Sequence, residues 1–171
     1  MRKRGLPPLA NPQAEVLVLG SFPSVASLAR REYYAHAQNH FWKIVGALSG
    51  RDLFGDGEGR YAARVAAAAA LKLAVWDVVA MCERVGSGDE RIENAVINDF
   101  AALIKTTPRL RRVCFNGLAA AKLGRPVFDT LKSASGLSLE ILVLPSTSPR
   151  NARMTLKEKT RIWKQAIASD N

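Results

Sequence analysis

The sequence predicts an α/β fold of three layers, α/β/α, around a central and mostly parallel sheet of four strands. Four short apolar runs lack the polar alternation of half-exposed strands, which is typical of parallel strands covered on both faces. Helical stretches lie between these runs, and strands that alternate with helices favour this layered arrangement. The chain has 171 residues, 48% of them apolar and 23% charged, which suffices for one globular core. We therefore expect a single domain over residues 1–171.

The predicted strands are rich in branched and aromatic side chains. They are residues 15–20 (EVLVLG), 73–76 (LAVW), 112–115 (RVCF) and 139–144 (LEILVL). Residues 1–14 come before the first strand as a basic leader. This leader begins MRKRGLPP, and its early prolines distinguish it from a secretory signal peptide. We expect it to be flexible.

Three segments between the strands carry helix signals. The first begins at Phe41, has apolar residues at 41, 42, 45 and 48, and stops near Gly50. The second, residues 61–71, is rich in alanine, which is the strongest helix former. The third is expected over residues 99–105, with Asn98 as its N-terminal cap.

The last helix has the clearest start signal in the sequence. Thr155 and Glu158 have the spacing of a capping box, in which each side chain satisfies a free backbone amide of the first turn. One stripe of the helix is then apolar, with a lysine stem filling a gap between larger side chains. The stripe consists of Leu156, Lys159, Trp163 and Ile167.

The charge of the chain points to a polyanionic partner. Lysine and arginine total 25 against 15 acidic residues, a net charge of +10. Nucleic acid is the first candidate partner and an anionic membrane the second, although basic residues also simply keep a protein soluble. The longest uncharged apolar run, residues 65–71, is too short to span a bilayer. Cys82 and Cys114 lack the spacing of a metal site, so we expect a cytoplasmic protein without a metal or cofactor.

Polar residues follow every predicted strand, and ligands of an open parallel sheet bind beyond the carboxyl ends of its strands. Residues 20–24 (GSFPS) follow the first strand, and a polar and aromatic loop continues from them to Asn39. Asp77 follows the second strand, Asn116 the third, and residues 145–153 (PSTSPRNAR) the fourth. Each segment alone is more often a turn than a site. Together they converge on one edge of the sheet.

Three segments in combination resemble the uracil-DNA glycosylase superfamily: residues 19–24 (LGSFPS), 33–42 (YYAHAQNHFW) and 144–149 (LPSTSP). Within it the chain is most similar to the hypoxanthine (deoxyinosine) glycosylase branch, beside the mismatch-specific uracil glycosylases. The similarity extends from about residue 15 to 165. The chain departs from the family at Ala37, where members often have proline, and at Phe22, where the mismatch-specific relatives carry a catalytic asparagine.

The resemblance implies a monofunctional DNA repair glycosylase without a cofactor. Such an enzyme flips a deaminated base, here preferably hypoxanthine, out of DNA and hydrolyses its N-glycosidic bond to leave an abasic site. We expect it to act as a monomer on DNA that contains deaminated bases. Uracil or mismatch-specific activity on the same fold is one alternative. A non-catalytic DNA-binding module is another, favoured by Phe22 and opposed by the motif around Asn39.

The resemblance also implies roles for three residues of the first loop. Asn39 would orient the attacking water, although asparagine at this position would equally well cap the helix that begins at Phe41. Tyr34 would stack under the flipped base, a contact worth about 1–3 kcal/mol, unless it only packs in the core. Phe22 would either close the other side of the pocket or form its hydrophobic floor.

Two further groups of side chains are candidates to contact the departing base. The amide of Asn116 matches the keto oxygen and ring N–H of hypoxanthine or uracil, unless Asn116 only forms a turn with the glycine after it. His36 and, less directly, His40 could donate a hydrogen bond to the base or be structural.

Asp77 is a candidate of a different kind. It is either a structural acid near the pocket or a second ligand of the water.

Hydroxyl groups of two loops are candidates to bind DNA phosphates. Phosphate contacts fix the register of a protein on DNA without reading its sequence. Arg150 and Arg153 add charge to the later loop, which relatives insert into the duplex. The alternative is an ordinary serine-rich loop. The candidate hydroxyl groups belong to Ser21, Ser24, Ser146, Thr147 and Ser148.

Overall fold

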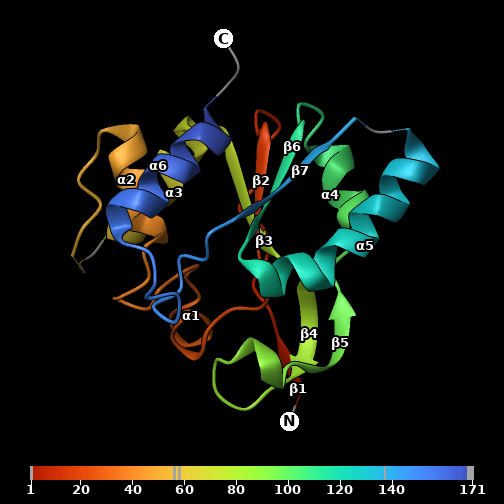
Figure 1. Ribbon diagram of the computed structural model, residues 1–171, viewed down its shortest axis with the longest axis horizontal. Helices are drawn as coiled ribbons and strands as arrows, with labels where there is room; N and C mark the ends of the chain where they lie inside the picture. Colours follow the sequence, from red (N-terminus) through yellow and green to blue (C-terminus); the bar gives the residue numbers. More distant parts are fainter. Residues whose placement is uncertain (1, 56, 58, 137, 169–171) are drawn as a thin grey trace.

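The computed structural model describes residues 2–55, 57, 59–136 and 138–168 (Figure 1). Its middle layer is a sheet of four parallel strands in the order β3-β2-β6-β7, which confirms the predicted fold class. The strands are β2 (Val16–Gly20), β3 (Leu73–Asp77), β6 (Arg112–Asn116) and β7 (Glu140–Leu144).

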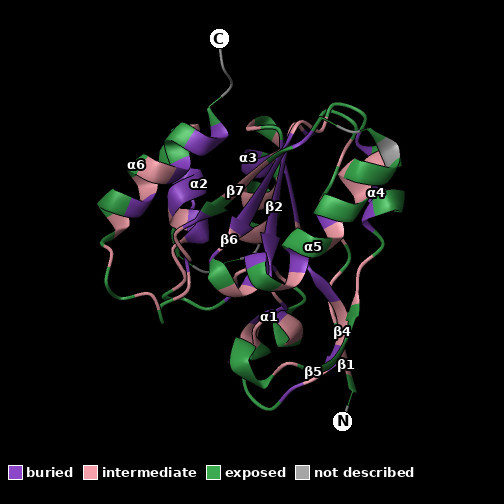
Figure 2. Ribbon diagram, turned by 45° about the vertical axis from the view of Figure 1, so that its right-hand side comes forward, coloured by how far each residue is buried: buried purple, intermediate pink, exposed green. Residues whose placement is uncertain are grey.

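Helices cover both faces of this sheet. One face carries α2 (Phe41–Ser49), α3 (Arg60–Ala70) and α6 (Leu156–Ile167), and the other carries α4 (Phe100–Thr106) and α5 (Leu118–Ser135) (Figure 1). Figure 2 shows buried strands between helices whose outer faces are exposed. No helix in the described part of the chain is long and apolar enough to cross a membrane.

The position of β2 between two layers of helices explains why its sequence lacks polar alternation. Val16 and Val18 belong to the core cluster under α2, α3 and α6. Leu17 and Leu19 point the other way and belong to the cluster under α4 and α5. Successive side chains of a strand face opposite sides, so a strand between two helix layers needs apolar residues at every position.

The expected helix ends are found with one correction. At the start of α6, Thr155 Oγ1 accepts from Glu158 N, and the Glu158 carboxylate accepts from Thr155 N. The predicted cap of α4 is wrong, because Asp99 accepts the hydrogen bond from Ala102 N. Asn98 instead donates its side-chain amide to the backbone oxygen of Asp77 at 2.9 Å.

A second, antiparallel sheet was not predicted. It has the order β1-β4-β5, with β1 (Arg2–Arg4), β4 (Val79–Glu83) and β5 (Glu93–Ile97). The expectation of a flexible leader is therefore wrong for its first residues, since β1 pairs with β4. The leader is held further along as well, because the Tyr33 hydroxyl donates to the backbone oxygen of Leu6 at 3.1 Å.

Two helices were also missed. The short α1 (Val25–Arg30) is capped by Ser24. The long α5 contains Gly124 and Pro126, which weaken a helix prediction from sequence. A side chain at Gly124 would overlap the ring of Phe115, so this glycine lets α5 lie close against β6.

Candidate functional site

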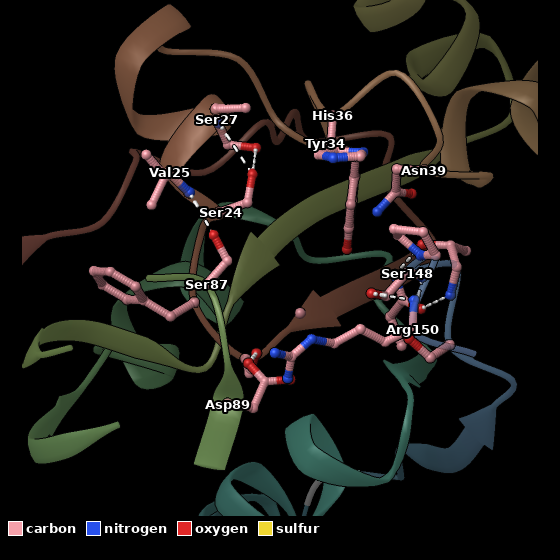
Figure 3. Close-up of a pocket in the computed structure, with 18 of the residues that line it drawn as sticks. Ser24, Val25, Ser27, Tyr34, His36, Asn39, Ser87, Asp89, Ser148 and Arg150 are labelled. Carbon is pink, nitrogen blue, oxygen red and sulfur yellow. Dashed lines mark hydrogen bonds between the residues drawn. The ribbon is translucent and has the colours of Figure 1, made fainter. Parts of the chain in front are cut away.

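A pocket of about 550 Å³ opens beyond the carboxyl ends of the four parallel strands (Figure 3). Segments far apart in the sequence form its walls, including Ser87 and Asp89, which sequence reasoning did not identify. Most of the residues that the sequence singled out as site candidates line the same pocket, but His40 and Arg153 do not. Those that line it are Ser21, Phe22, Ser24, Tyr34, His36, Asn39, Asp77, Asn116, Ser146, Thr147, Ser148 and Arg150.

The two adjacent tyrosines of the first loop have different environments. Tyr33 is buried in the core, and its backbone oxygen accepts from the Trp42 indole at 2.7 Å. Tyr34 has a left-handed backbone, with φ of 53°, which turns its side chain into the pocket (Figure 3). Its ring packs on Phe41 with centroids 4.2 Å apart. Tyr34, and not Tyr33, is therefore the aromatic side chain that a base in the pocket would meet.

Asn39 is held in place by the start of α2. Its Oδ1 accepts from Phe41 N at 2.9 Å, and its backbone N–H donates to His36 O at 2.8 Å. His40 N donates to Thr147 O at 2.9 Å and joins this turn to the loop after β7. The N-cap of α2 is His40, which makes no side-chain cap bond, so Asn39 does not cap the helix as the alternative expected. The contact of Asn39 with Phe41 N forms a short turn that leads into the helix. It leaves the amide nitrogen and the second lone pair of Oδ1 for a ligand.

Asn116 is engaged inside the protein. Its Oδ1 accepts from Thr147 N at 2.8 Å, and its Nδ2 donates to Thr147 Oγ1 at 2.9 Å. One N–H and one oxygen lone pair remain after these two bonds. The carboxamide therefore fixes the loop after β7 first, and only its remaining capacity can contact a base.

The carboxyl group of Asp77 lies in the floor of the pocket. The side chain is buried, and its Oδ2 has no hydrogen-bond partner. Burial raises its pKa to about 7, opposed by the charge of Arg84 and assisted by that of Asp89. A Cβ at Gly20 would overlap Asp77 Oδ1, so the glycine makes room for this carboxyl group.

The hydroxyl groups of the predicted phosphate contacts make hydrogen bonds inside the protein, and two of them are used in this way at the pocket wall. Thr147 is fully buried and its Oγ1 accepts from Asn116, so its expected phosphate contact is not available in this structure. The Ser24 hydroxyl accepts from Ser27 N and donates to Ser27 Oγ, which caps α1. Both hydroxyl groups serve turns at the pocket wall.

The loop after β7 is supported from below by α6. Lys159, fully buried, donates its ammonium group to Asn151 O at 2.9 Å. The Trp163 indole donates to Pro145 O at 3.0 Å. Within the loop, Ser148 N donates to Ser146 Oγ at 3.2 Å. These contacts hold the loop at both ends and leave its centre at the pocket mouth.

Acidic residues face the predicted phosphate contacts across the pocket mouth. Asp89 and Glu90 belong to a short 3₁₀ helix, η1 (Asp89–Arg91). Arg150 extends across toward Asp89 (Figure 3) and donates to the Glu90 carboxylate at 2.9 Å. The Ser21 hydroxyl donates to the Asp89 carboxylate.

Phe22 forms part of the floor beneath the first loop. It is buried in the core cluster under α4 and α5. The guanidinium carbon of Arg84 lies 4.8 Å from the centre of its ring, and Arg84 also donates to Pro23 O. Of the two roles left open by the sequence, the hydrophobic floor fits this position.

Comparisons with known proteins match nearly the full length of this chain. The family model of the uracil DNA glycosylase superfamily matches residues 7–167. A hypoxanthine DNA glycosylase of Methanosarcina barkeri is 33% identical over 167 residues, covering 98% of this chain and 99% of the relative. That of Methanosarcina acetivorans is 34% identical over 163 residues, covering 95% and 96%. The solution NMR structure of a candidate uracil DNA glycosylase from Methanosarcina acetivorans superposes with a TM-score of 0.76 at 32% identity, covering 98% of this chain and 100% of that one.

Proposed function

The chain belongs to the uracil-DNA glycosylase superfamily, and we propose that it removes hypoxanthine from DNA as a monofunctional glycosylase. The observation that carries the proposal is the pocket at the strand ends, because one cavity gathers the aromatic ring of Tyr34 and the amide of Asn39. A base in duplex DNA must leave the stack before its glycosidic bond can be reached. The pocket is the place for that base, and an abasic site is the product.

Tyr34 provides the surface on which the flipped base stacks. Phe41 backs its ring at 4.2 Å, so the ring is held before the base arrives. Stacking of one base on an aromatic side chain contributes about 1–3 kcal/mol. This contribution offsets part of the cost of leaving the duplex stack, which is itself a few kcal/mol.

Asn39 orients the water that attacks the sugar. Cleavage gives the sugar oxocarbenium character and the base negative charge. A neutral amide is a weak base, so bond breaking carries most of the barrier and Asn39 only has to hold the water. The contact of its Oδ1 with Phe41 N fixes the amide in one orientation.

The rim of the pocket binds the DNA backbone. The net charge of +10 attracts DNA without regard to its sequence. Arg150 and Ser148 lie at the mouth of the pocket, where they can contact phosphates near the flipped nucleotide. We further propose that the protein acts as a monomer in the cytoplasm.

The test is excision from an end-labelled duplex that carries one deoxyinosine, followed by alkali. Strand cleavage at the lesion is the expected result, with a slower reaction on the same duplex carrying deoxyuridine. Binding to the duplex without cleavage would instead support a non-catalytic DNA-binding module. Faster cleavage at deoxyuridine would support the uracil-specific alternative.

A further inference from the structure

We propose that Asp77 is a catalytic residue that donates a proton to N7 of the departing hypoxanthine. This inference rests on the proposed function and adds the group that neutralises the leaving base. The carboxyl group lies in the pocket floor and is not explained by the stacking, water and phosphate contacts described above.

The register of the sheet places Asp77 beside the pocket floor. Gly20 and Asp77 are paired at the ends of neighbouring parallel strands. A Cβ built on Gly20 would overlap Asp77 Oδ1 and lie 3.3 Å from the Tyr34 hydroxyl. The Asp77 carboxyl group and the Tyr34 hydroxyl group therefore lie on either side of the space that a side chain at Gly20 would occupy.

One oxygen of the Asp77 carboxyl group lacks a partner among the described residues. Asp77 Oδ2 is buried without a hydrogen bond to any described residue, whereas the Tyr34 hydroxyl interacts with the side chain of Asn116. Native proteins rarely leave such atoms unsatisfied, and the exceptions often belong to functional sites. A half-turn about χ2 exchanges the two carboxyl oxygens, so either can face a base in the pocket.

Burial favours the protonated form of Asp77, and the charges around it act in opposite directions. Arg84, at the end of β4, opposes protonation, whereas Asp89 of η1 favours it. The hydroxyl groups of Tyr33 and Tyr34 lie near Asp77 and stay neutral, because burial raises the pKa of both. With the pKa of Asp77 at about 7, a large share of the protein carries the proton at neutral pH.

The proposed step balances in atoms and charge. The bond between the sugar carbon C1′ and N9 breaks, and its electron pair stays on the base. The O–H bond of Asp77 breaks as the N7–H bond forms, so hypoxanthine leaves as a neutral molecule and Asp77 becomes a carboxylate. Water adds to C1′ and releases its proton to solvent, from which Asp77 is protonated again. General acid catalysis of this kind contributes about 10²–10⁴-fold in rate.

The same step gives a reason to prefer a purine. N7 is a ring nitrogen that accepts a proton and communicates directly with N9 through the five-membered ring. Uracil has no such atom and offers only its keto oxygens. A fixed acid at the pocket floor therefore helps hypoxanthine to leave more than it helps uracil.

The experiment compares wild type with Asp77→Asn in single-turnover excision of hypoxanthine between pH 5.5 and 9. Asparagine keeps the shape and a hydrogen-bond donor but has no proton to transfer. We expect the wild-type rate to fall as pH rises through about 7, and the variant rate to be about 10²-fold lower or more and independent of pH. Binding to a duplex with uncleavable 2′-fluoro-deoxyinosine should change less than threefold.

Asp129→Asn, which changes an exposed aspartate on α5, is the matched control and should keep the wild-type profile. A rate for Asp77→Asn within threefold of wild type, or an equal loss of binding and rate, would overturn the proposal. If the variant does not fold, the wild-type profile decides, because a rate that rises between pH 6 and 8 excludes an acid at this position. A wild type that excises no hypoxanthine at any pH contradicts the proposed function instead.

Discussion

Asn116 and Thr147 exchange two hydrogen bonds, of 2.8 and 2.9 Å, across the carboxyl ends of β6 and β7. The Asn116 carboxamide both accepts from the backbone and donates to the hydroxyl of the same residue. Because Thr147 is fully buried, water cannot replace either contact. The pair therefore joins the end of the sheet to the loop proposed to contact DNA.

Asn116→Ala is expected to destabilise the protein and to weaken DNA binding together. Each buried polar group that loses its partner costs about 1–3 kcal/mol, and this substitution leaves Thr147 N unpaired. Thr147→Val should cost less, since the backbone bond to Asn116 Oδ1 remains. Urea unfolding and duplex binding measure the two effects. Unchanged stability in Asn116→Ala, with a large loss of rate, would mean that Asn116 acts on the base directly.

Two substitutions of Asn39 separate its contact with Phe41 N from its proposed contact with the attacking water. Asn39→Ala should reduce hypoxanthine excision by about 10²-fold or more and leave binding of damaged DNA in place. Asn39→Asp keeps an oxygen for Phe41 N and should retain the melting temperature of the wild type while losing the N–H donor. Single-turnover rates and melting curves check both. Full activity in Asn39→Asp would show that only the oxygen of this side chain matters.

Tyr34 should contribute mainly to the recognition of the flipped base. Tyr34→Ala is expected to weaken lesion-specific binding by about 1–3 kcal/mol, while binding to undamaged duplex stays the same. Tyr34→Phe keeps the stacking surface and the contact with Phe41, so its specific binding should remain near wild type. Competition between deoxyinosine and normal duplexes measures the difference. Equal losses on both duplexes would remove Tyr34 from the pocket assignment.

The ion pair of Arg150 and Glu90 engages the guanidinium group that we propose contacts DNA. Both side chains are largely exposed, and such pairs contribute at most about 1 kcal/mol. Glu90→Gln should therefore tighten binding to undamaged duplex by up to about fivefold. Arg150→Ala should weaken it and reduce the slope of log affinity against log salt by about 0.9. A salt slope that Arg150→Ala leaves unchanged would show that Arg150 contacts no phosphate.

Asp77 should make stability depend on pH. Its pKa in the folded protein, about 7, exceeds the ordinary value of 3.8, so the folded state binds the proton more strongly than the unfolded state. The contribution of this group to stability is complete below about pH 4 and is lost as pH rises toward 7. The melting temperature of wild type should fall over this range more than that of Asp77→Asn. Parallel curves for the two proteins would contradict this.

The parallel sheet was predictable because burial leaves a clear pattern in the sequence. Val16, Leu17, Val18 and Leu19 are apolar without alternation, and each is buried against one of the two helix layers. The strand β5 carries the opposite pattern, with polar and exposed residues such as Glu93 and Asn94. It is a strand because it pairs with β4, and such long-range pairing leaves little trace in local sequence.

The site was predictable in its location more than in its contacts. Gly20, Asp77 and Asn116 lie at the ends of predicted parallel strands. We expected them at one edge of the sheet, since the carboxyl ends of parallel strands share an edge. The partnership of Asn116 with Thr147 depends on the register of β6 and β7, which sequence does not specify. Asp89 was missed for the same reason, because its contact with Ser21 spans 68 residues.

The support of the loop after β7 by Lys159 and Trp163 has a consequence for the order of folding. Residues 20–39 of the pocket wall precede the loop after β7 in the chain, and that loop is held by α6, which follows both. A chain that has not yet formed α6 therefore has a half-built cavity, and the proposed ability to hold an extruded nucleotide arises only when this helix docks on the loop.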